Sequence, residues 1–307
     1  MHSLLLFTLW TSCFLVGTHT HPTVVAANNP KPLTWAVIVS SSRFWLNYRH
    51  TTNALAIYNS IKRLGVQDNR IVLMLADSMA CDPRNPLPGE IYSHHLDHLH
   101  KNLYGKPPFQ VDYCGRDVGV RSVLDVLTGN HPPGTLPSRR MDSDANATVF
   151  IYLTGHGGDG FLKFHDQDEL LSADIAAAVQ YMHAAHRYRE LFLFIDTCQA
   201  ATLYNRLSHM PRWAAVSSST LGQSSYALRN DLGIGAHLVD EFSAYVADYL
   251  DGIDVNSTKA MHGPTIQDLI DELKTKRLSS SVHVDARKLG RPLDSVSVLE
   301  VFGQPYH

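Results

Sequence analysis

Two reactive side chains stand at equivalent places in the sequence, each three residues after an apolar run. His156 follows TVFIYL at 148–153, and Cys198 follows LFLFI at 191–195. The thiolate is the reactive form of cysteine, and a free pKa near 8.5 leaves only a small fraction of it at neutral pH. A neighbouring imidazole can take the thiol proton and later protonate a leaving amine. The pair therefore indicates catalysis by a thiol, although each residue alone has an ordinary explanation, a small buried side chain or an incidental surface histidine.

Glycines surround the histidine, with Gly155, Gly157 and Gly158 in the run TGHGGDG. Glycine allows the backbone to approach a ligand closely, so a substrate carbonyl can reach main-chain N–H groups at this point. We expect the N–H groups of Gly157 and Cys198 to form an oxyanion hole, which would stabilise the charge that develops on a tetrahedral intermediate.

The elements that must position these residues form an α/β pattern, because apolar β-type runs alternate with helical patterns. This alternation predicts a mostly parallel, six-stranded sheet flanked by helices. Ligands of such sheets bind beyond the carboxyl ends of the strands, and loops leaving strands about 5 Å apart can bring His156 and Cys198 together. The expected strands are 35–39, 71–76, 148–153, 191–195, 213–216 and 296–302, and the expected helices are 48–64, 119–127, 172–186, 236–250 and 266–276.

The composition excludes several classes of protein. The 307 residues include 26 Lys and Arg and 29 Asp and Glu, a net charge of −3, whereas a dedicated nucleic-acid binder depends on a basic surface. With 44% hydrophobic and 18% charged residues, the chain is globular in composition and long enough to bury a sizeable core. Its four cysteines are too few for a disulfide-built scaffold.

The N-terminal segment predicts entry into the secretory pathway. Residues 4–16 form an apolar run of signal-peptide length, followed by small residues. We expect a signal peptide at 1–27 with cleavage between 17 and 27, a catalytic domain at 28–255, and a C-terminal extension at 256–307 that packs on the same domain. A buried N-terminal helix is the alternative for the apolar run. Secretion would also make the sequons at Asn146 and Asn256 possible sites of N-glycosylation.

Two longer segments around the reactive residues resemble a known clan of enzymes. YLTGHGGDGFLKF at 152–164 and FIDTCQA at 194–200 are similar to the legumain-type, caspase-like clan of cysteine peptidases. Three further segments, SSRFWLNYRH at 41–50, MLADSMACDPRNP at 74–86 and VLTG at 126–129, resemble more narrowly the family of catalytic subunits of glycosylphosphatidylinositol (GPI) transamidase, in the peptidase C13 group. The resemblance extends from about residue 35 to about residue 250.

The resemblance implies a caspase-like three-layer sandwich and specific roles for site residues. By it, His156 is the general base, Cys198 is the nucleophile, and the side-chain amide of Asn47 orients the histidine as the third member of a triad. Ser218 and Ser219 match the wall of the clan's substrate pocket. Asn47 has an alternative role as the N-cap of the following helix, and the two serines have an alternative role in ending a strand.

The resemblance also implies the reaction. Cys198 would cleave the C-terminal GPI-attachment signal of a precursor protein through a thioester, and the ethanolamine-phosphate amine of a GPI lipid would resolve that thioester. The implied partners are other subunits of a membrane-bound complex in the endoplasmic reticulum lumen. No apolar stretch beyond the N-terminal run is long enough for a span, so we expect a short form without a C-terminal span, in indirect contact with the membrane. The alternatives are a legumain-like asparaginyl endopeptidase and a catalytically silent scaffold that binds precursor tails.

The remaining cysteines and the possible metal ligands leave several questions open. Signal-peptide removal would take Cys13, after which Cys81 pairs either with Cys114 or, as the resemblance suggests, with a cysteine of another subunit. We assign no metal and no cofactor. The acidic residues Asp68 and Asp112 lie where some members of the fold bind a cation, and four histidines gather in one short segment, but neither group has a convincing set of ligands; these histidines are His94, His95, His98 and His100.

Overall fold

The computed structural model describes residues 33–94, 100–104, 110–228, 230–254 and 263–303. The expected signal peptide, the sequon at Asn256, and His95 and His98 of the histidine segment lie outside these residues. Among the described residues, no helix combines the length and the apolar character that crossing a bilayer requires.

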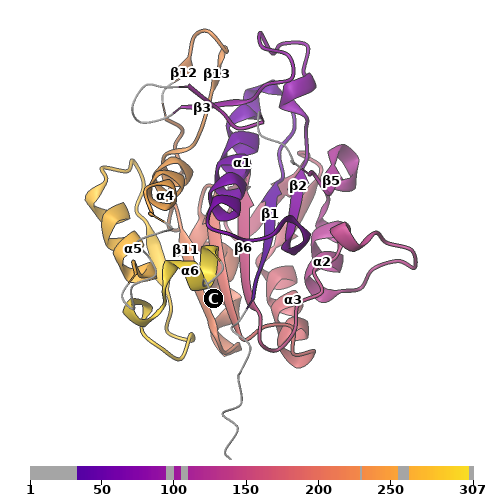
Figure 1. Ribbon diagram of the computed structural model, residues 1–307, viewed down its shortest axis with the longest axis vertical. Coiled ribbons are helices and arrows are strands. Elements are labelled where there is room, and N and C mark those ends of the chain that lie inside the picture. Colours follow the sequence, from indigo (N-terminus) through magenta and orange to yellow (C-terminus); the bar gives the residue numbers. More distant parts are fainter. Residues whose placement is uncertain (1–32, 95–99, 105–109, 229, 255–262, 304–307) are drawn as a thin grey trace, which may run out of the picture. The chain divides into compact units, whose positions relative to one another are not determined.

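A central sheet organises the domain, as the alternation of elements predicted (Figure 1). Neighbouring strands run parallel, except that β14 is antiparallel to β11. The sheet has seven strands and not six. In spatial order they are β14 (His283–Asp285), β11 (Trp213–Ser217), β10 (Glu190–Asp196), β6 (Thr148–Thr154), β1 (Thr34–Ser40), β2 (Ile71–Leu75) and β5 (Tyr113–Cys114).

The strand expected at 296–302 is wrong, because this segment forms helix α6 (Val298–Phe302). Ser297 caps the helix by accepting a hydrogen bond from the Leu299 N–H, and Glu300 accepts one from the Ser297 N–H. This reciprocal pattern is a capping box, and its Ser-x-x-Glu signature stands in the sequence. In the central sheet, the sequence did not predict β5 and β14, which are only two and three residues long and too short to show a period.

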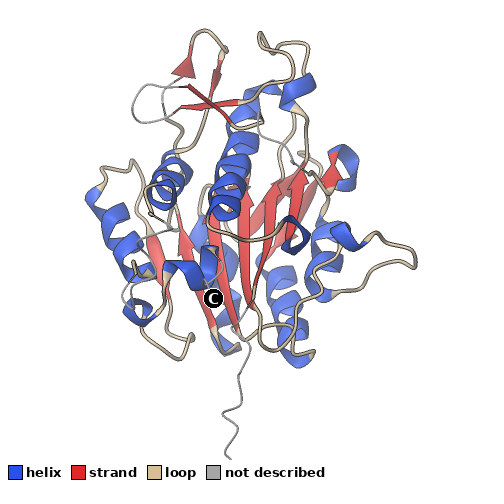
Figure 2. Ribbon diagram, in the orientation of Figure 1, coloured by secondary structure: helices blue, strands red, loops and turns tan. Residues whose placement is uncertain are grey.

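Helices cover both faces of the sheet, which gives the three layers (Figure 2). On one face, α1, α4, α5 and α6 enclose an apolar core with alternate sheet residues such as Ile38, Phe150 and Phe194. On the other face, α2 and α3 enclose a second core with the intervening residues, such as Val37 and Ile151. The strands are therefore apolar throughout, as buried parallel strands are. The helices are α1 (Tyr48–Arg63), α2 (Val120–Thr128), α3 (Ser172–Ala184), α4 (Glu241–Asp251) and α5 (Ile266–Thr275).

Smaller elements decorate the sheet. β7 (Gly157–Gly158), β8 (Phe161–Phe164) and β9 (Asp168–Leu171) form a small antiparallel sheet directly after β6. Two hairpins follow other strands: β3 (Tyr92–His94) with β4 (His100–Asn102), and β12 (Asn230–Asp231) with β13 (Ala236–His237). The 3-10 helices are η1 (Trp45–Asn47), η2 (Asp68–Arg70), η3 (Met79–Cys81), η4 (Gly115–Asp117), η5 (Pro137–Arg139), η6 (Ala200–His209) and η8 (Leu293–Ser295).

The described part of the C-terminal segment is built into the sheet and its core. β14 extends the sheet beyond β11. The ring of Phe302 contacts the rings of Phe150 and Phe194 on β6 and β10, with centroids 4.8 and 5.2 Å apart. Arg291 donates hydrogen bonds of 2.8 Å to both Glu190 on β10 and Glu300 on α6. This segment therefore contributes to the core that supports the strands ending at the site.

Candidate active site

The register of the sheet brings His156 and Cys198 together. Thr154, the last residue of β6, pairs with Asp196, the last residue of β10. His156 and Cys198 each stand two residues beyond this pair on adjacent strands. Both residues line one small cavity of about 20 Å³, together with Thr197 of the loop that carries the thiol. The two loops thus meet at the carboxyl edge of the sheet, where parallel sheets place their ligands.

Two glycines allow this close approach. A Cβ atom added to Gly157 would lie 2.5 Å from the Thr197 Oγ1 atom and 2.8 Å from the Phe161 carbonyl oxygen. A Cβ atom on Gly155 would lie 2.0 Å from the Ser41 Oγ atom. Contacts below 3 Å are not tolerated, so any larger residue at either position would push the histidine loop away from its neighbours.

Two backbone N–H groups beside the reactive pair, those of Gly157 and Cys198, are the expected donors of an oxyanion hole. Gly157 pairs with Leu162 across β7 and β8, and the Lys163 N–H donates to the His156 carbonyl at 2.8 Å. In an antiparallel ladder this pattern makes Gly157 and Leu162 a non-hydrogen-bonded pair, so the ladder does not use the Gly157 N–H. Among the described residues, the Cys198 N–H has no backbone acceptor. An oxyanion hole at these donors stays a prediction, and its two N–H groups are available.

Asn47 holds the histidine by its side chain. It stands at the N-cap position of α1 but makes no side-chain capping bond. Instead, its Nδ2 group donates to the Arg43 carbonyl at 2.7 Å, and its Oδ1 atom lies 2.8 Å from His156 Nε2. Because the amide nitrogen faces a carbonyl, the amide oxygen must face the imidazole and accept its Nε2–H. The Nδ1 atom of His156 is then the unprotonated nitrogen, as a general base requires.

The surroundings of His156 favour the neutral imidazole. Burial lowers its pKa, and the positive charge of Arg49 lowers the pKa further. A second histidine, His50, packs edge-on against it with ring centroids 5.0 Å apart. The pKa of His50 lies well below its ordinary value because the ring is buried, with further lowering by Arg49. A neutral His156 at neutral pH can accept the thiol proton.

Sequence reasoning missed the polar residues beneath the reactive pair. Arg49, His50, Asp196 and Asp240 line the same cavity as Cys198. The Arg49 Nε atom lies 3.1 Å from Asp240 Oδ1, so the guanidinium donates to this carboxyl group on the wall of the cavity. The sequence held two signals for them. Arg49 and His50 lie close to Asn47, and Asp196 stands at the end of its strand. Asp240 had none, because the fold brings it from a distant segment.

Burial changes the acidity of the two carboxyl groups. Desolvation, and then the charge of Asp196, raise the pKa of Asp240 to about 7. Desolvation also raises the pKa of Asp196, although the hydroxyls of Ser225 and Ser243 donate hydrogen bonds to its carboxylate. The wall of the cavity therefore carries fewer negative charges near neutral pH than its composition suggests.

Ser218 and Ser219 support the loop that carries the thiol. Both side chains are fully buried. The Ser219 hydroxyl donates to the Thr197 carbonyl at 2.7 Å and accepts from the Ala200 N–H at 3.0 Å, so it connects the two sides of Cys198. The Ser218 hydroxyl donates to the same carbonyl at 3.3 Å. Contact of these side chains with substrate stays a prediction, whereas their positioning of the loop is a feature of the structure.

The other residues singled out in the sequence lie away from this cavity. Cys81 and Cys114 are both exposed and free in the structure, so neither forms the disulfide that was one of the alternatives. Asn146 is exposed in a turn before β6. Asp68 and Asp112 are engaged by protein donors: Asp68 accepts from the Tyr58 hydroxyl at 2.7 Å, and Asp112 accepts from the Leu73 N–H at 2.9 Å.

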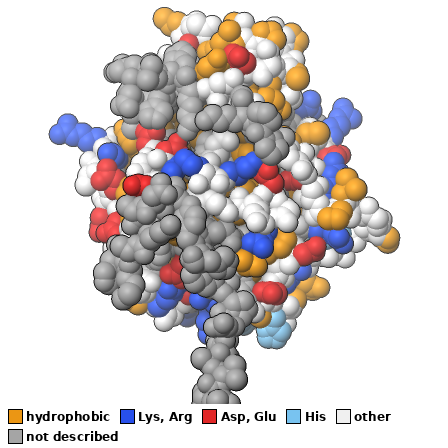
Figure 3. All heavy atoms as spheres, in the orientation of Figure 1, with side chains coloured by type: hydrophobic (Ala, Val, Ile, Leu, Met, Phe, Trp, Pro, Cys, Tyr) orange, Lys and Arg blue, Asp and Glu red, His pale blue; other side chains and the backbone are white. Residues whose placement is uncertain are grey.

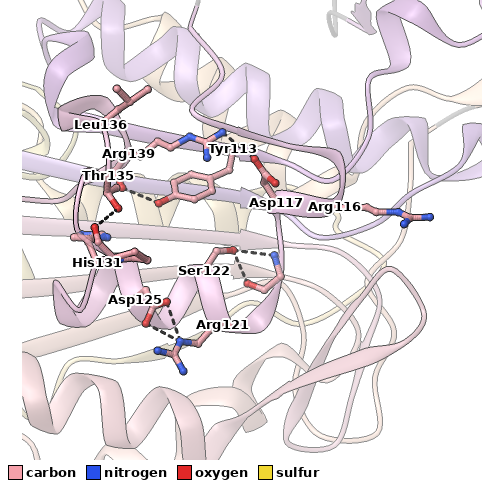
Figure 4. Close-up of a pocket in the computed structure, with 13 residues that line it drawn as sticks. Tyr113, Arg116, Asp117, Arg121, Ser122, Asp125, His131, Thr135, Leu136 and Arg139 are labelled. Atoms are coloured by element: carbon pink, nitrogen blue, oxygen red, sulfur yellow. Dashed lines mark hydrogen bonds and ion pairs between the residues drawn. The ribbon is translucent and has the colours of Figure 1, made fainter.

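A larger cavity of about 440 Å³ lies beside α2 and shares no lining residue with the cavity at Cys198 (Figure 4). Its charged side chains largely pair with one another: Arg121 donates to both oxygens of Asp125 at 2.8 Å, and Arg139 donates to Asp117 at 2.9 Å. Size alone would favour this cavity as the active site. The reactive pair and the unused N–H groups favour the smaller one.

Comparison with solved structures places the fold. Caspase-1 of Spodoptera frugiperda is similar to 90% of this chain and to 93% of its own, with a TM-score of 0.50 at 12% sequence identity. At this identity the likeness concerns the fold alone, and it agrees with the three-layer arrangement expected from the sequence.

Comparison of sequences identifies the family. The chain is 42% identical over 279 residues to the GPI-anchor transamidase of Saccharomyces cerevisiae, covering 91% of this chain and 65% of that protein. It is 46% identical over 228 residues to the GPI-anchor transamidase of Homo sapiens, covering 74% and 57%. It is 39% identical over 280 residues to the GPI-anchor transamidase of Schizosaccharomyces pombe, covering 91% of this chain and 72% of that protein. The chain thus spans less than two thirds of the budding-yeast and human relatives. The family model of peptidase C13 matches residues 34–284, and the chain belongs to the peptidase C13 family.

Proposed function

We propose that this chain is the catalytic subunit of a GPI transamidase, in which Cys198 forms the acyl-enzyme. His156 Nδ1 takes the thiol proton, the sulfur attacks the carbonyl of the attachment-site residue, and the C–N bond breaks as the same imidazole protonates the leaving amine. The amine of the GPI ethanolamine phosphate then attacks the thioester. It gives its proton to His156, and the thiol of Cys198 is released as the new amide forms.

The arrangement of Asn47, His156 and Cys198 on adjacent loops is the observation that supports this proposal. Asn47 holds the protonated Nε2 atom of His156. The unprotonated Nδ1 atom is then free to accept the thiol proton, as thiol acyl transfer requires. The relatives named GPI-anchor transamidase, at 39–46% identity, support the choice of substrate and acceptor within the family.

The cavity beneath the thiol supports a small residue at the attachment site. Its volume of about 20 Å³ is room for about one water molecule. A large side chain would therefore require the wall to move. Arg49 offers N–H donors and Asp240 offers acceptors there, so a small polar or very small apolar side chain fits this lining best.

We propose the following organisation around the catalytic site. Residues 1–27 are a signal peptide, 28–255 are the catalytic domain, and 256–307 are an extension on the same domain, which the placement of β14 and Arg291 supports. The chain acts in the endoplasmic reticulum lumen and reaches the membrane through the other subunits of the complex. The exposed thiol of Cys81 is then free to bond a partner subunit. Non-reducing electrophoresis tests this, because Cys81→Ser should abolish a heavier species that reduction also removes.

The test of the proposed reaction uses cells that lack this gene. Wild-type chain should restore a GPI-anchored reporter to the cell surface, and Cys198→Ala and His156→Ala should fail at equal expression. His209→Ala, which removes an exposed histidine, serves as the matched control and should restore the reporter.

Mass spectrometry of the reporter then separates the alternatives. An amide to the anchor is the expected product, whereas a free carboxyl at the attachment site would indicate an endopeptidase. Restoration by Cys198→Ala would indicate a scaffold and would refute the proposal.

A further inference from the structure

The small antiparallel sheet that follows β6 places a lysine beside the catalytic histidine. Gly157 pairs with Leu162 across β7 and β8. One position further along this pairing, the Lys163 N–H donates to the His156 carbonyl at 2.8 Å, so Lys163 and His156 stand directly opposite one another. The side chains of directly opposite residues point to the same face of an antiparallel pair, with Cβ atoms about 5 Å apart.

The side chain of Lys163 lies on the open face of this small sheet. Along β8, Leu162 and Phe164 are buried, whereas Phe161 and Lys163 are half-buried. This alternation is that of a strand with one face packed on the core and the other face toward solvent. The ammonium group of Lys163 is therefore accessible on the same side as the imidazole of His156.

The positive charge of Lys163 has no partner in the described part of the chain. Glu169 stands opposite Lys163 on β9, and Asp166 lies in the turn between β8 and β9; both of these acidic residues are exposed. Among the described residues, however, the ammonium group forms no ion pair and no hydrogen bond. It is therefore available to bind an anion.

The charge of Lys163 acts on the histidine. Burial lowers the pKa of His156 most, Arg49 and then Lys163 lower it further, and Asp166 raises it. Arg49 lies 3.1 Å from Asp240, in the wall of the cavity beneath the thiol. Of the two cations that act on His156, Lys163 is thus the one without a carboxylate within ion-pair distance in the described residues.

The proposed reaction brings the acceptor amine to this side of the site. His156 protonates the leaving amine and later takes a proton from the attacking amine, so the two amines occupy the same place beside its Nδ1 atom. In ethanolamine phosphate, two carbons and one ester oxygen separate the amine from the phosphorus. This bridge is similar in length to the Cβ separation of His156 and Lys163. The flexible lysine stem can therefore bring its ammonium group to the phosphate of a bound acceptor.

The protein as a whole does not attract an anion, so a phosphate at the reaction centre needs a local cation. The net charge of the chain is −3. On the face shown in Figure 3, the described basic and acidic side chains are interspersed, without a single broad basic area. A specific contact beside His156 is therefore a better means of holding the acceptor than a general surface charge.

We propose that Lys163 binds the phosphate of the incoming ethanolamine phosphate and so selects this acceptor over water and over amines without a phosphate. This inference rests on the proposed function. An ion pair at this point would hold the acceptor amine next to the thioester, an advantage that a small neutral amine lacks. Lys163 is then an acceptor-binding residue, whereas formation of the thioester depends on the thiol, the imidazole and the oxyanion donors.

Partition of the thioester between two acceptors tests this inference. Membranes from cells that lack the native gene carry the full chain with its partners, and they process a reporter precursor in the presence of hydroxylamine. The GPI of the membrane gives the anchored reporter, and hydroxylamine gives a reporter hydroxamate. Each amine forms a C–N bond at the same carbonyl, breaks the C–S bond and releases the thiol of Cys198. The ratio of the two products, measured by mass spectrometry, does not depend on how fast the thioester forms.

The charge at position 163 should set this ratio. Lys163→Gln should lower the ratio of anchored reporter to hydroxamate about ten-fold, the scale of one hydrogen bond to a charged group. Lys163→Arg keeps the charge and should keep the wild-type ratio, and Lys163→Glu should lower the ratio further. Lys288→Gln is the matched control, because it removes an exposed lysine beside the start of β11, at the opposite edge of the sheet, and it should leave the ratio unchanged.

Measurement at several pH values separates binding of the phosphate from an effect on the base. Loss of phosphate binding should lower the ratio at every pH, whereas a change in the pKa of His156 alone would lower it only where the imidazole titrates. A fall confined to that pH range would overturn the inference. So would an unchanged ratio in Lys163→Gln, or an equal fall in Lys288→Gln. Loss of both products in Lys163→Gln would place the lysine in thioester formation and would also overturn it.

The same assay keeps this inference separate from the proposed function. If wild type makes both products and Cys198→Ala makes neither, the catalytic proposal stands, whatever the lysine variants show. If Cys198→Ala makes either product, the proposed function is refuted.

Discussion

Replacement of Asn47 by aspartate tests how the histidine is held. The carboxylate would take the place of an amide oxygen that lies 2.8 Å from His156 Nε2. Two opposite unit charges about 4 Å apart attract by roughly 4 kcal/mol at an effective dielectric constant of 20. His156 is partly exposed, so we halve this value to about 2 kcal/mol, enough to move its titration upward by about one pH unit or more. In the wild-type chain, burial and Arg49 act in the opposite direction and lower the pKa.

The assay is a pH titration of His156 by NMR with labelled histidine, assigned with His156→Gln and compared with the pH dependence of reporter processing. In Asn47→Asp the imidazolium should persist to higher pH, and the acid limb of the processing rate should move upward with it. Asn47→Ala is the control. It removes the acceptor without adding charge, so the rate should fall while the titration moves little. If Asn47→Asp leaves the titration unchanged, or Asn47→Ala processes at the wild-type rate, the proposed contact does not position the histidine.

Three further perturbations follow from the structure. Gly157→Ala should slow processing about ten-fold or more, because its methyl group would lie 2.5 Å from Thr197 Oγ1; a normal rate in a folded variant would contradict the close approach of the loops. The pKa of Asp240, raised to about 7 by burial and then by Asp196, keeps this carboxyl protonated in the folded chain while the unfolded chain ionises. As the pH rises from about 4 to 7, the contribution of Asp240 to the free energy of unfolding therefore decreases. Urea denaturation should show no such decrease for Asp240→Asn. Arg291→Ala should lower the free energy of unfolding by about 2 kcal/mol or more, since Glu190 is buried and loses its bidentate partner; an unchanged urea midpoint would contradict this.

The sequence predicted the parts of this fold that have strong local patterns. Long apolar runs identified β1, β6 and β10, and these strands place His156 and Cys198 at one edge. The missed elements have short or non-local causes. β14 is three residues long and depends on its pairing with β11. α6 depends on the capping box at Ser297, which lies inside the apolar run that predicts a strand.

The candidate site shows the same division between local and non-local information. Asn47, His156 and Cys198 follow from motifs and from positions at strand ends. The wall of the small cavity does not, because Asp240 comes from a segment almost two hundred positions after Asn53, whose Nδ2 group donates to it at 2.5 Å. The hydroxyl of Ser219 supports the thiol loop from within, which no local pattern indicated, and contact of Ser219 with substrate stays a prediction. Sequence separation conceals such contacts, which arise from the packing of α4 on α1 and from the position of β11 beside β10.

The segment between β1 and the first turn of α1 connects all the features of the site. Asn47 holds His156, and Arg49 lines the small cavity. Thr51, a few residues further on, lines a second cavity of about 220 Å³ at the ends of β2 and β5. The Phe44 N–H donates to Asp77, which lines the same second cavity. Since β1 stands between β6 and β2 in the sheet, this loop is the element that can contact both the histidine loop and the ends of β2 and β5. A shift of this one loop would therefore disturb the base and both cavities together, which gives a physical reason why the motif SSRFWLNYRH extends over ten consecutive residues.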